Sequence, residues 1–343
     1  MGRAGPAARA GTGWHAAGVR ATRPTSLLAL LLLAAGLLGC GPGEDPDAGP
    51  TSAPVLVGAW PEPEARLLAE IAAGLVTAAD GGAQVVVLAD ADAARRALEL
   101  GDVAVLPAYT GEAWLEVLGR ADPPSDPATS LARVREFDER DGLRWLSPPI
   151  GDVEDLTSPP ADATFAFVVS PAAVPAGEDP PGTLSQLAGL LGRLERPTLC
   201  VEPGFAQRAD GLAAVLQAYS VARDQVQVLG VPPADAVAGV LAGECDAGLT
   251  TATDGQVWRA GLQPLVDDLG VFPAFVPTLV VDEDALAARP SLAVELRPLV
   301  AALTTASLGG WNGRVAAGEP VTTVAEDVVE QLLGPSDPDV AQQ

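Results

Sequence analysis

Residues 55–111 read VLVGAWPEPEARLLAEIAAGLVTAADGGAQVVVLADADAARRALELGDVAVLPAYTG, and this stretch decides the fold. Three short apolar runs have the length and composition of buried strands: 55–58, 85–88 and 103–106. The two segments between them, 62–79 and 91–100, carry apolar residues at the spacing of an amphipathic helix. Strand, helix, strand, helix, strand at this spacing predicts βαβ units, and therefore a parallel sheet with helices on both faces.

The same alternation begins again after the Pro- and Asp-rich loop 148–160. Strands are expected at 164–169, 198–201, 226–229 and 246–250. Helices are expected between them, at 183–194 (with Thr183 as its cap), 205–219 and 234–242. One more apolar strand and two final helices close the chain, at 275–281, 291–304 and 322–333.

Two copies of one α/β layout predict two lobes, each a mainly parallel sheet flanked by helices, with a ligand cleft between them. In this hypothesis 54–163 is the first part of lobe 1 and 164–274 is lobe 2. The chain returns to lobe 1 over 275–335, and 336–343 is a disordered tail.

The N-terminus has the pattern of an export signal. Its first 25 residues hold four arginines and no acid, and an apolar run at 26–39 follows, which is shorter than the ~18 residues that a membrane-spanning helix needs. Residues 37–40 read LLGC and resemble the bacterial lipobox. We therefore expect a lipoprotein signal peptide at 1–39, a lipidated Cys40 and a flexible acidic linker at 40–53. The protein would then be lipid-anchored on the extracytoplasmic face of the cell membrane; the alternative is an ordinary signal with a chance cysteine.

Composition excludes several function classes. The formal net charge is −25, which argues against binding nucleic acid, because phosphate contacts need clustered cations. The chain has no lysine, and its one histidine, His15, lies in the expected signal. The mature protein would lack an imidazole base, a histidine metal ligand and a Schiff-base lysine. We therefore expect no catalytic residue, no metal and no cofactor; only carboxylate-based catalysis stays open.

Two cysteines remain beside Cys40. Cys200 ends one expected strand and Cys245 precedes another, so their sulfurs could lie at opposite ends of neighbouring parallel strands. A disulfide and two buried free thiols are both compatible with an oxidising compartment.

Aromatic residues gather at the ends of the expected strands. Ligands of parallel sheets bind at the carboxyl ends of strands, which here places 58–60, 109–111, 202–205 and 250–254 around one cleft. Aromatic rings facing a cleft can surround a quaternary ammonium by cation–π attraction. The candidates are Trp60, Tyr109, Phe165, Phe205 and Tyr219, with core packing as the alternative.

Polar candidates lie beside these rings. Arg208 could bind a ligand carboxylate through two hydrogen bonds, or pair with Glu202 or Asp210 as a structural bridge. Thr110 and Thr253 could donate hydroxyl hydrogen bonds in the cleft.

Motifs spread over most of the chain resemble one family, the substrate-binding proteins of bacterial ABC importers for glycine betaine, choline, carnitine and related osmoprotectants. The matching segments are 57–60 with Glu64, 97–111, 142–148, 164–166, 205–211, 246–254, 265–273 and Asn312. The resemblance implies a two-lobed periplasmic-binding-protein-like fold (type II) that binds a small quaternary amine or zwitterion and delivers it to an ABC permease in the membrane.

The resemblance also assigns roles to single positions. Tyr109 and Thr110 match the family's motif, whereas Phe165 stands where the family has a tyrosine, and Trp60 stands where it has a polar residue. We expect a monomer that is no enzyme. Three alternatives stay open: a receptor for another small zwitterion or amine, a carboxylate-based enzyme, and a sensor or partner-binding protein.

Overall fold

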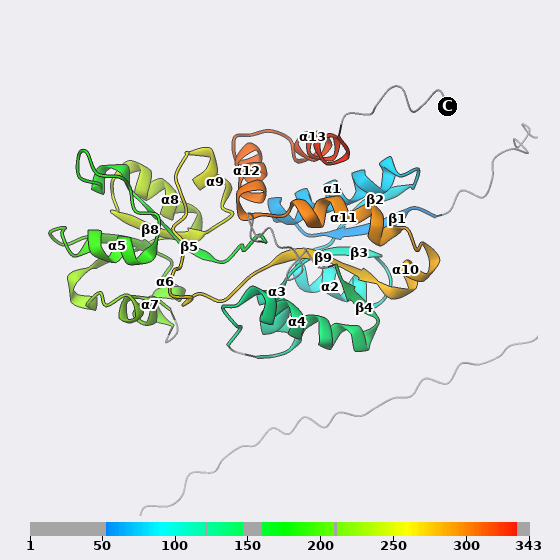
Figure 1. Cartoon of the computed structure of the whole chain (residues 1–343), viewed down its shortest axis with the longest axis horizontal. Coiled ribbons are helices and arrows are strands. Elements are labelled where there is room, and N and C mark those ends of the chain that lie inside the picture. The colour runs from blue at the N-terminus through cyan, green and yellow to red at the C-terminus, as the bar shows by residue number, and fades with distance from the viewer. Residues whose placement is uncertain (1–52, 121, 147–159, 209–210, 335–343) are drawn as a thin grey trace, which may run out of the picture. The chain divides into compact units, whose positions relative to one another are not determined.

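The computed structural model describes residues 53–120, 122–146, 160–208 and 211–334, which belong to one compact unit. The expected signal peptide at 1–39, Cys40, nearly all of the linker and the tail at 336–343 lie outside the described residues. Two β-sheets with helices packed against them form the described part of the chain, as predicted (Figure 1).

The first sheet has five strands in the order β2-β1-β3-β9-β4. The parallel pairs join β1 (Val55–Ala59) to β2 (Ala83–Val87) and to β3 (Val105–Tyr109), which are the three strands expected from the opening stretch. The antiparallel pairs join β9 (Pro277–Asp282) to β3 and to β4 (Leu143–Trp145). Half of this sheet is therefore antiparallel, because β9 enters it on the return from the second sheet.

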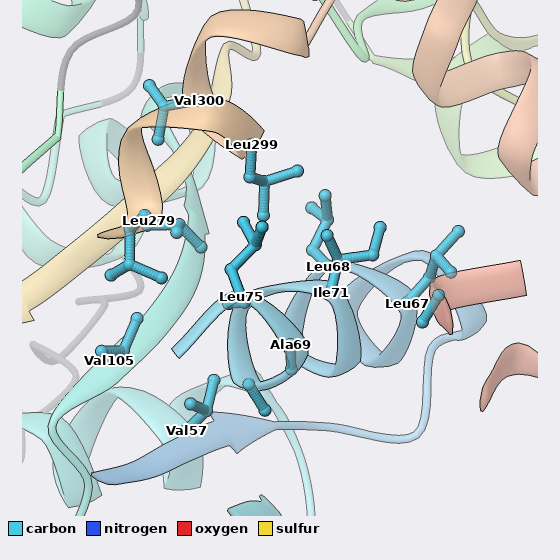
Figure 2. Packing of buried hydrophobic residues seen from close by; sticks show 14 of the residues in the cluster. Val57, Leu67, Leu68, Ala69, Ile71, Leu75, Val105, Leu279, Leu299 and Val300 are labelled. Atoms are coloured by element: carbon cyan, nitrogen blue, oxygen red, sulfur yellow. The ribbon is translucent and has the colours of Figure 1, made fainter. Parts of the chain in front are cut away.

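Helix α1 (Pro63–Ala78) builds the main core of the first sheet. Pro63 occupies its first turn, where a missing N–H costs nothing. Its apolar face packs against α11 (Leu292–Ala302) and α13 (Val321–Leu333), as Figure 2 shows for Leu68, Leu75 and Leu299. These three leucines are fully buried, and truncating such a side chain to alanine costs about 2–5 kcal/mol.

Shorter helices cover the rest of the first sheet. Asp90 and Asp126 cap α2 (Ala91–Glu99) and α4 (Pro127–Asp138) by accepting a backbone N–H three residues ahead. Buried Asp138 accepts two hydrogen bonds from Arg95 and one from the indole N–H of Trp145, which fixes α2, α4 and β4 together. The remaining helices are α3 (Thr110–Glu112), which continues as a π-helical turn at Ala113–Val117, and α10 (Glu283–Ala288).

The second sheet has four strands in the order β5-β8-β6-β7. Its strands are β5 (Phe165–Val169), β6 (Thr198–Val201), β7 (Gln227–Gly230) and β8 (Ala247–Thr251). Strand β6 pairs in parallel with β7 and β8, whereas β5 pairs with β8 in the antiparallel sense. The accompanying helices are α5 (Leu184–Leu191), α6 (Pro203–Gln207), α7 (Leu212–Ala218), α8 (Pro233–Ala242) and α9 (Gly255–Arg259). Thr183 caps α5, as predicted.

A disulfide joins Cys200 and Cys245, with 5.7 Å between their Cα atoms. Cys200 pairs in register with Gly248, and the turn after α8 brings Cys245 back beside β6. The close fit needs a glycine on α8, because a Cβ atom at Gly239 would lie 2.8 Å from the sulfur of Cys200. Of the two alternatives for this pair, the structure therefore contains the bridge.

Several segments differ from the sequence expectation, which included neither strand β4 nor the short helices α9 and α10. The single helix expected over 205–219 is two helices, α6 and α7, with Gly211 at the N-cap of the second. A helix that was not expected, α12 (Thr305–Ala316), lies between α11 and α13. Its three glycines lower helix propensity, but a capping box between Thr304 and Ser307 fixes its start.

Helix α12 packs closely on α9, so it brings the end of the chain against the loop that follows β8. A Cβ atom at Gly309 would overlap the indole ring of Trp258, so only glycine permits this approach. Among the described residues no single helix is long and apolar enough to cross a membrane; the bent pair α11–α12 meets the criterion by length and composition only.

Candidate ligand-binding cleft

A cavity of about 1000 Å³ lies where segments that follow both sheets come together. The first sheet contributes the residues after β1, the starts of α1 and α2, and the end of β3. The second sheet contributes the loop after β8 and the start of α9. The two crossing segments, around 163–165 and at Phe275, and one face of α12 complete the wall.

Trp60 and Tyr109 form the aromatic side of the cavity. Because β1 and β3 are parallel neighbours, the residues at their carboxyl ends meet, as the sequence pattern predicted. The two rings are 6.4 Å apart and inclined by 72°, an edge-to-face contact that holds both in place. Both are largely buried, yet both line the cavity.

Glu64 is the centre of the polar wall. Its carboxylate accepts a hydrogen bond of 2.6 Å from the hydroxyl of Tyr109 and one from the amide of Asn312 on α12. The amide of Asn312 also donates to the backbone oxygen of Thr253 at 2.9 Å. One carboxylate thus joins α1, β3, α12 and the loop after β8.

The protonation of Glu64 reflects two opposed effects. Burial raises the pKa of Glu64 above its ordinary value, and the negative charge of Asp254 raises it further. The hydrogen bonds from Tyr109, Thr253 and Asn312 act against that rise, because they stabilise the charged form. Burial and the charge of Glu64 also raise the pKa of Tyr109 well above its usual range, so this phenol stays a hydrogen-bond donor.

Four other carboxylates also line the cavity: Glu62, Asp90, Glu112 and Asp254. Glu112 is exposed to the cavity, but the surrounding protein removes part of its water. This desolvation, together with the charges of Glu62, Glu116, Glu64 and Asp92, raises the pKa of Glu112 to about 7. Within the part of the chain that the structure describes, no arginine lines the cavity.

Phe165 and Phe275 come from the two crossing segments and add apolar wall. Asp162 ties these segments together, because its carboxylate accepts the backbone N–H of Phe275 at 2.8 Å and that of Thr164 at 3.1 Å. Burial raises the pKa of Asp162 to about 6, although both of these hydrogen bonds act to lower it. Behind Phe165, the rings of Phe205 and Phe272 lie 5.1 and 5.8 Å away.

The structure brings four of the eight sequence candidates to the cavity: Trp60, Tyr109, Phe165 and Thr253. The other four lie outside its lining. Phe205 packs behind Phe165 in the second core, and Tyr219 lies in the same core. Thr110 is fully buried and exchanges hydrogen bonds with the backbone of Ala274 and Val276, which ties β3 to the returning segment.

Arg208 is exposed at the end of α6, with its guanidinium 5.9 Å from the centre of the Phe205 ring. Two backbone hydrogen bonds to the carboxylate of Glu202 are the main cause that lowers its pKa, and the charge of Arg208 lowers it further. This position corresponds to the structural alternative weighed for Arg208, a contact with Glu202, more closely than to a ligand clamp in the cavity.

Sequence reasoning did not identify Glu64 and Asn312 as site residues, although both belong to the matching motifs. They lie 248 positions apart, so nothing local in the sequence indicates that they meet. Gln256 was also missed. Asp254 belongs to the stretch 250–254 that the strand order placed at the cleft, but it was not named as a site residue; in the structure it caps α9.

Comparison with known proteins agrees with this architecture. Residues 53–331 match the family model described as the substrate binding domain of ABC-type glycine betaine transport systems. The chain is 28% identical to the glycine betaine-binding protein YehZ of Escherichia coli (strain K12), over 69% of this chain and 76% of that protein. It is 25% identical to a glycine-betaine-binding protein of Pseudomonas aeruginosa, over 65% and 69% of the two chains.

Among solved structures, apo YehZ from Escherichia coli superposes with a TM-score of 0.69 at 27% identity, covering 82% of this chain and 99% of that one. A glycine betaine/carnitine/choline ABC transporter structure has the same TM-score at 20% identity and shares the fold. The fold is that of an extracytoplasmic substrate-binding protein of ABC importers. The chain belongs to the family of substrate-binding domains of ABC-type glycine betaine transport systems. This is a family of transport proteins, not of enzymes.

Proposed function

We propose that the chain is the solute receptor of an ABC importer, that it binds a small quaternary amine in the cavity beside Trp60 and Tyr109, and that it delivers this solute to a membrane permease. The observation that carries the proposal is the edge-to-face ring pair next to a carboxylate-rich wall. Support comes from the family membership and from the names of the relatives.

The chemistry of the wall suits a quaternary ammonium group. Such a group has no N–H to donate, so it is recognised by π faces and by negative charge. A desolvated aromatic face contributes about 0.5–2 kcal/mol to binding a cation. The proposed contacts are Trp60, Tyr109, Phe165 and Phe275, with Thr253 as a polar neighbour. Glu64 would act as a positioning residue, because its hydrogen bond fixes the phenol of Tyr109.

The proposal also covers how the receptor is held at the membrane. The basic start, the apolar run and Cys40 support export and lipidation, with 40–53 as a tether. The protein would act as a monomer without catalytic activity. A Cys40→Ser variant should move from the membrane fraction to the soluble extracytoplasmic fraction and should not incorporate labelled fatty acid. Retention of the variant at the membrane would contradict the lipid anchor.

Calorimetric titration of the full chain with glycine betaine, choline, carnitine and proline betaine tests the binding proposal. A maltoside detergent should be used, because it carries no ammonium group. Saturable binding of at least one ligand, with one site per chain, is expected. A folded sample that binds none of the four would rule the proposal out, and turnover of any of them would favour an enzyme.

Two phenylalanines provide a matched pair of variants. Phe275 lines the cavity, whereas Phe272 packs against Phe165 and Phe205 outside the lining. Phe275→Leu should weaken ligand binding about threefold to thirtyfold, in line with the loss of one cation–π face. Phe272→Leu should leave the Kd of the folded protein within twofold. Equal effects of the two variants on the Kd would place the ligand elsewhere.

A further inference from the structure

The charges in the cavity wall all have one sign. Among the described residues, its ionisable side chains, apart from the phenol of Tyr109, are the carboxylates of Glu62, Glu64, Asp90, Glu112 and Asp254, and no basic side chain lines it. Glycine betaine carries a carboxylate beside its trimethylammonium group, and choline carries an alcohol in the same place. The cavity wall therefore interacts differently with the carboxylate of glycine betaine and with the alcohol of choline.

Helices α1, α2 and α9 all begin at the cavity, and the protein's own carboxylates cap the N-termini of α2 and α9. Helix α1 has no side-chain cap, but Pro63 removes one N–H from its first turn, and the acidic residues Glu62 and Glu64 lie at its start. Backbone N–H groups at a helix start are the usual alternative to arginine for binding an anion. At α2 the carboxylate of Asp90 accepts the N–H of Ala93 at 2.7 Å. At α9 the carboxylate of Asp254 accepts the N–H of Gln256 at 2.8 Å. Each cap replaces a free donor with a full negative charge.

The side-chain donors near the rings have partners as well. The hydroxyl of Tyr109 and the amide of Asn312 donate to Glu64, and the side chain of Thr253 acts on the same carboxyl by lowering its pKa. The amide of Gln256 donates to the backbone oxygen of Ala234 at 3.2 Å. A ligand carboxylate would have to compete with these acceptors while lying among like charges, and a buried anion without donors binds weakly.

We infer that this cavity selects a quaternary amine with a net positive charge and no carboxylate, of the choline type, over the zwitterion glycine betaine. The inference rests on the proposed function and narrows its substrate class. The trimethylammonium groups of both ligands meet the same rings. Only the alcohol of choline can donate a hydrogen bond to a wall carboxylate such as Asp254 or Glu112, whereas the carboxylate of glycine betaine is repelled by them.

Parallel calorimetric titrations of the full chain with choline and with glycine betaine test this inference. We expect choline to bind at least tenfold more tightly. Equal or tighter binding of glycine betaine overturns the inference and leaves the proposed function standing. Absence of binding by both ligands, with a folded sample, overturns the inference, and the proposed function falls as well if carnitine and proline betaine also fail to bind.

Charge-neutralising variants locate the source of the preference. Asp254→Asn keeps the cap of α9, because asparagine is also a good N-cap residue, and Glu112→Gln changes an exposed side chain. Each variant should lower the ratio of the Kd for glycine betaine to the Kd for choline by threefold or more. Asp126→Asn is the matched control, because Asp126 caps α4 outside the lining. A control that narrows the ratio equally would trace the preference to net charge and overturn the role of the cavity.

Discussion

The two tyrosines of this chain have similar local chemistry and different surroundings. Tyr109 and Tyr219 are each 8% exposed, and each donates its hydroxyl to a carboxylate, that of Glu64 or of Asp267. Burial is the main cause that raises both pKa values, so both phenols stay protonated. The ring of Tyr109 lines the cavity, whereas the ring of Tyr219 packs in the apolar core of the second sheet.

The comparison shows that a phenol–carboxylate pair does not by itself mark a ligand site. Tyr109 ends β3, and the carboxyl ends of β1 and β3 face the cavity. Tyr219 follows the last turn of α7, and its hydroxyl also accepts the N–H of Leu269 at 3.0 Å, which fixes a loop. The position of a residue in the sheet topology decides its role.

The largest expected effect comes from removing either ring. Tyr109→Ala and Tyr219→Ala should each lower the free energy of unfolding by about 3–5 kcal/mol, the usual cost of deleting a buried aromatic ring. Chemical denaturation measures this cost. Only Tyr109→Ala should also weaken choline binding by the folded protein, by tenfold or more. Weakened choline binding by folded Tyr219→Ala would contradict the assignment of Tyr219 to the core alone.

The disulfide offers a way to loosen the second sheet without touching either tyrosine. Cys200→Ala combined with Cys245→Ala should lower the free energy of unfolding by about 2–4 kcal/mol, because the bridge constrains the unfolded chain. Choline affinity should stay within twofold, since neither cysteine lines the cavity. A large loss of affinity in the folded variant would show that the site depends on the second core.

Removing only the hydroxyls is a milder change. Tyr109→Phe and Tyr219→Phe each remove one hydrogen bond to a carboxylate, which costs about 1–3 kcal/mol of stability. Glu64 keeps the amide of Asn312 as a donor, and Asp267 keeps the backbone N–H of Phe272. In Tyr109→Phe the pKa of Glu64 should rise further, because a hydrogen bond that lowers it is lost. Titration of the Glu64 carboxyl resonance by NMR measures that rise. An unchanged pKa would mean that the hydrogen bond to Tyr109 is not formed in solution.

The smallest expected effect is a pH dependence near the ring of Tyr109. The pKa of Glu112 is raised from 4.5 to about 7, and Glu62, Glu64, Glu116 and Asp92 are the charges that act on it. The folded state therefore holds this proton more tightly than the unfolded chain, and stability falls as pH rises from 4.5 through 7. Choline affinity should rise over the upper part of this range by about twofold to fivefold, as Glu112 becomes charged.

Glu112→Gln separates this residue from the other carboxyl groups. The variant should lose most of the rise in choline affinity between pH 6 and 8 while remaining folded. An affinity that rises as steeply in the variant as in the wild type would assign the effect to another group, such as Asp162, whose pKa is raised to about 6.

Much of the fold follows from the sequence, because apolar runs and helical spacing are local signals. All strands except the short β4, and the meeting of Trp60 with Tyr109, follow from the apolar runs and their order. The break between α6 and α7 and the existence of α12 do not, since they depend on a cap and on glycines that fit against Trp258.

The site was less predictable than the fold, because side-chain direction depends on packing. Tyr219 and Phe205 were grouped with Tyr109 by residue type, but the core of the second sheet encloses them. Glu64 and Asn312 meet only because α12 packs on α9 and brings the end of the chain to the start of α1. No local pattern encodes such a contact.

The most direct test uses the fact that the chain contains only two tyrosines. Selective labelling of tyrosine rings gives two sets of NMR signals, which Tyr219→Phe assigns. In the presence of saturating choline, nuclear Overhauser effects from the ligand methyl protons should reach the ring of Tyr109 and not that of Tyr219. Contacts to Tyr219, or to neither ring in a folded and choline-saturated sample, would contradict the account.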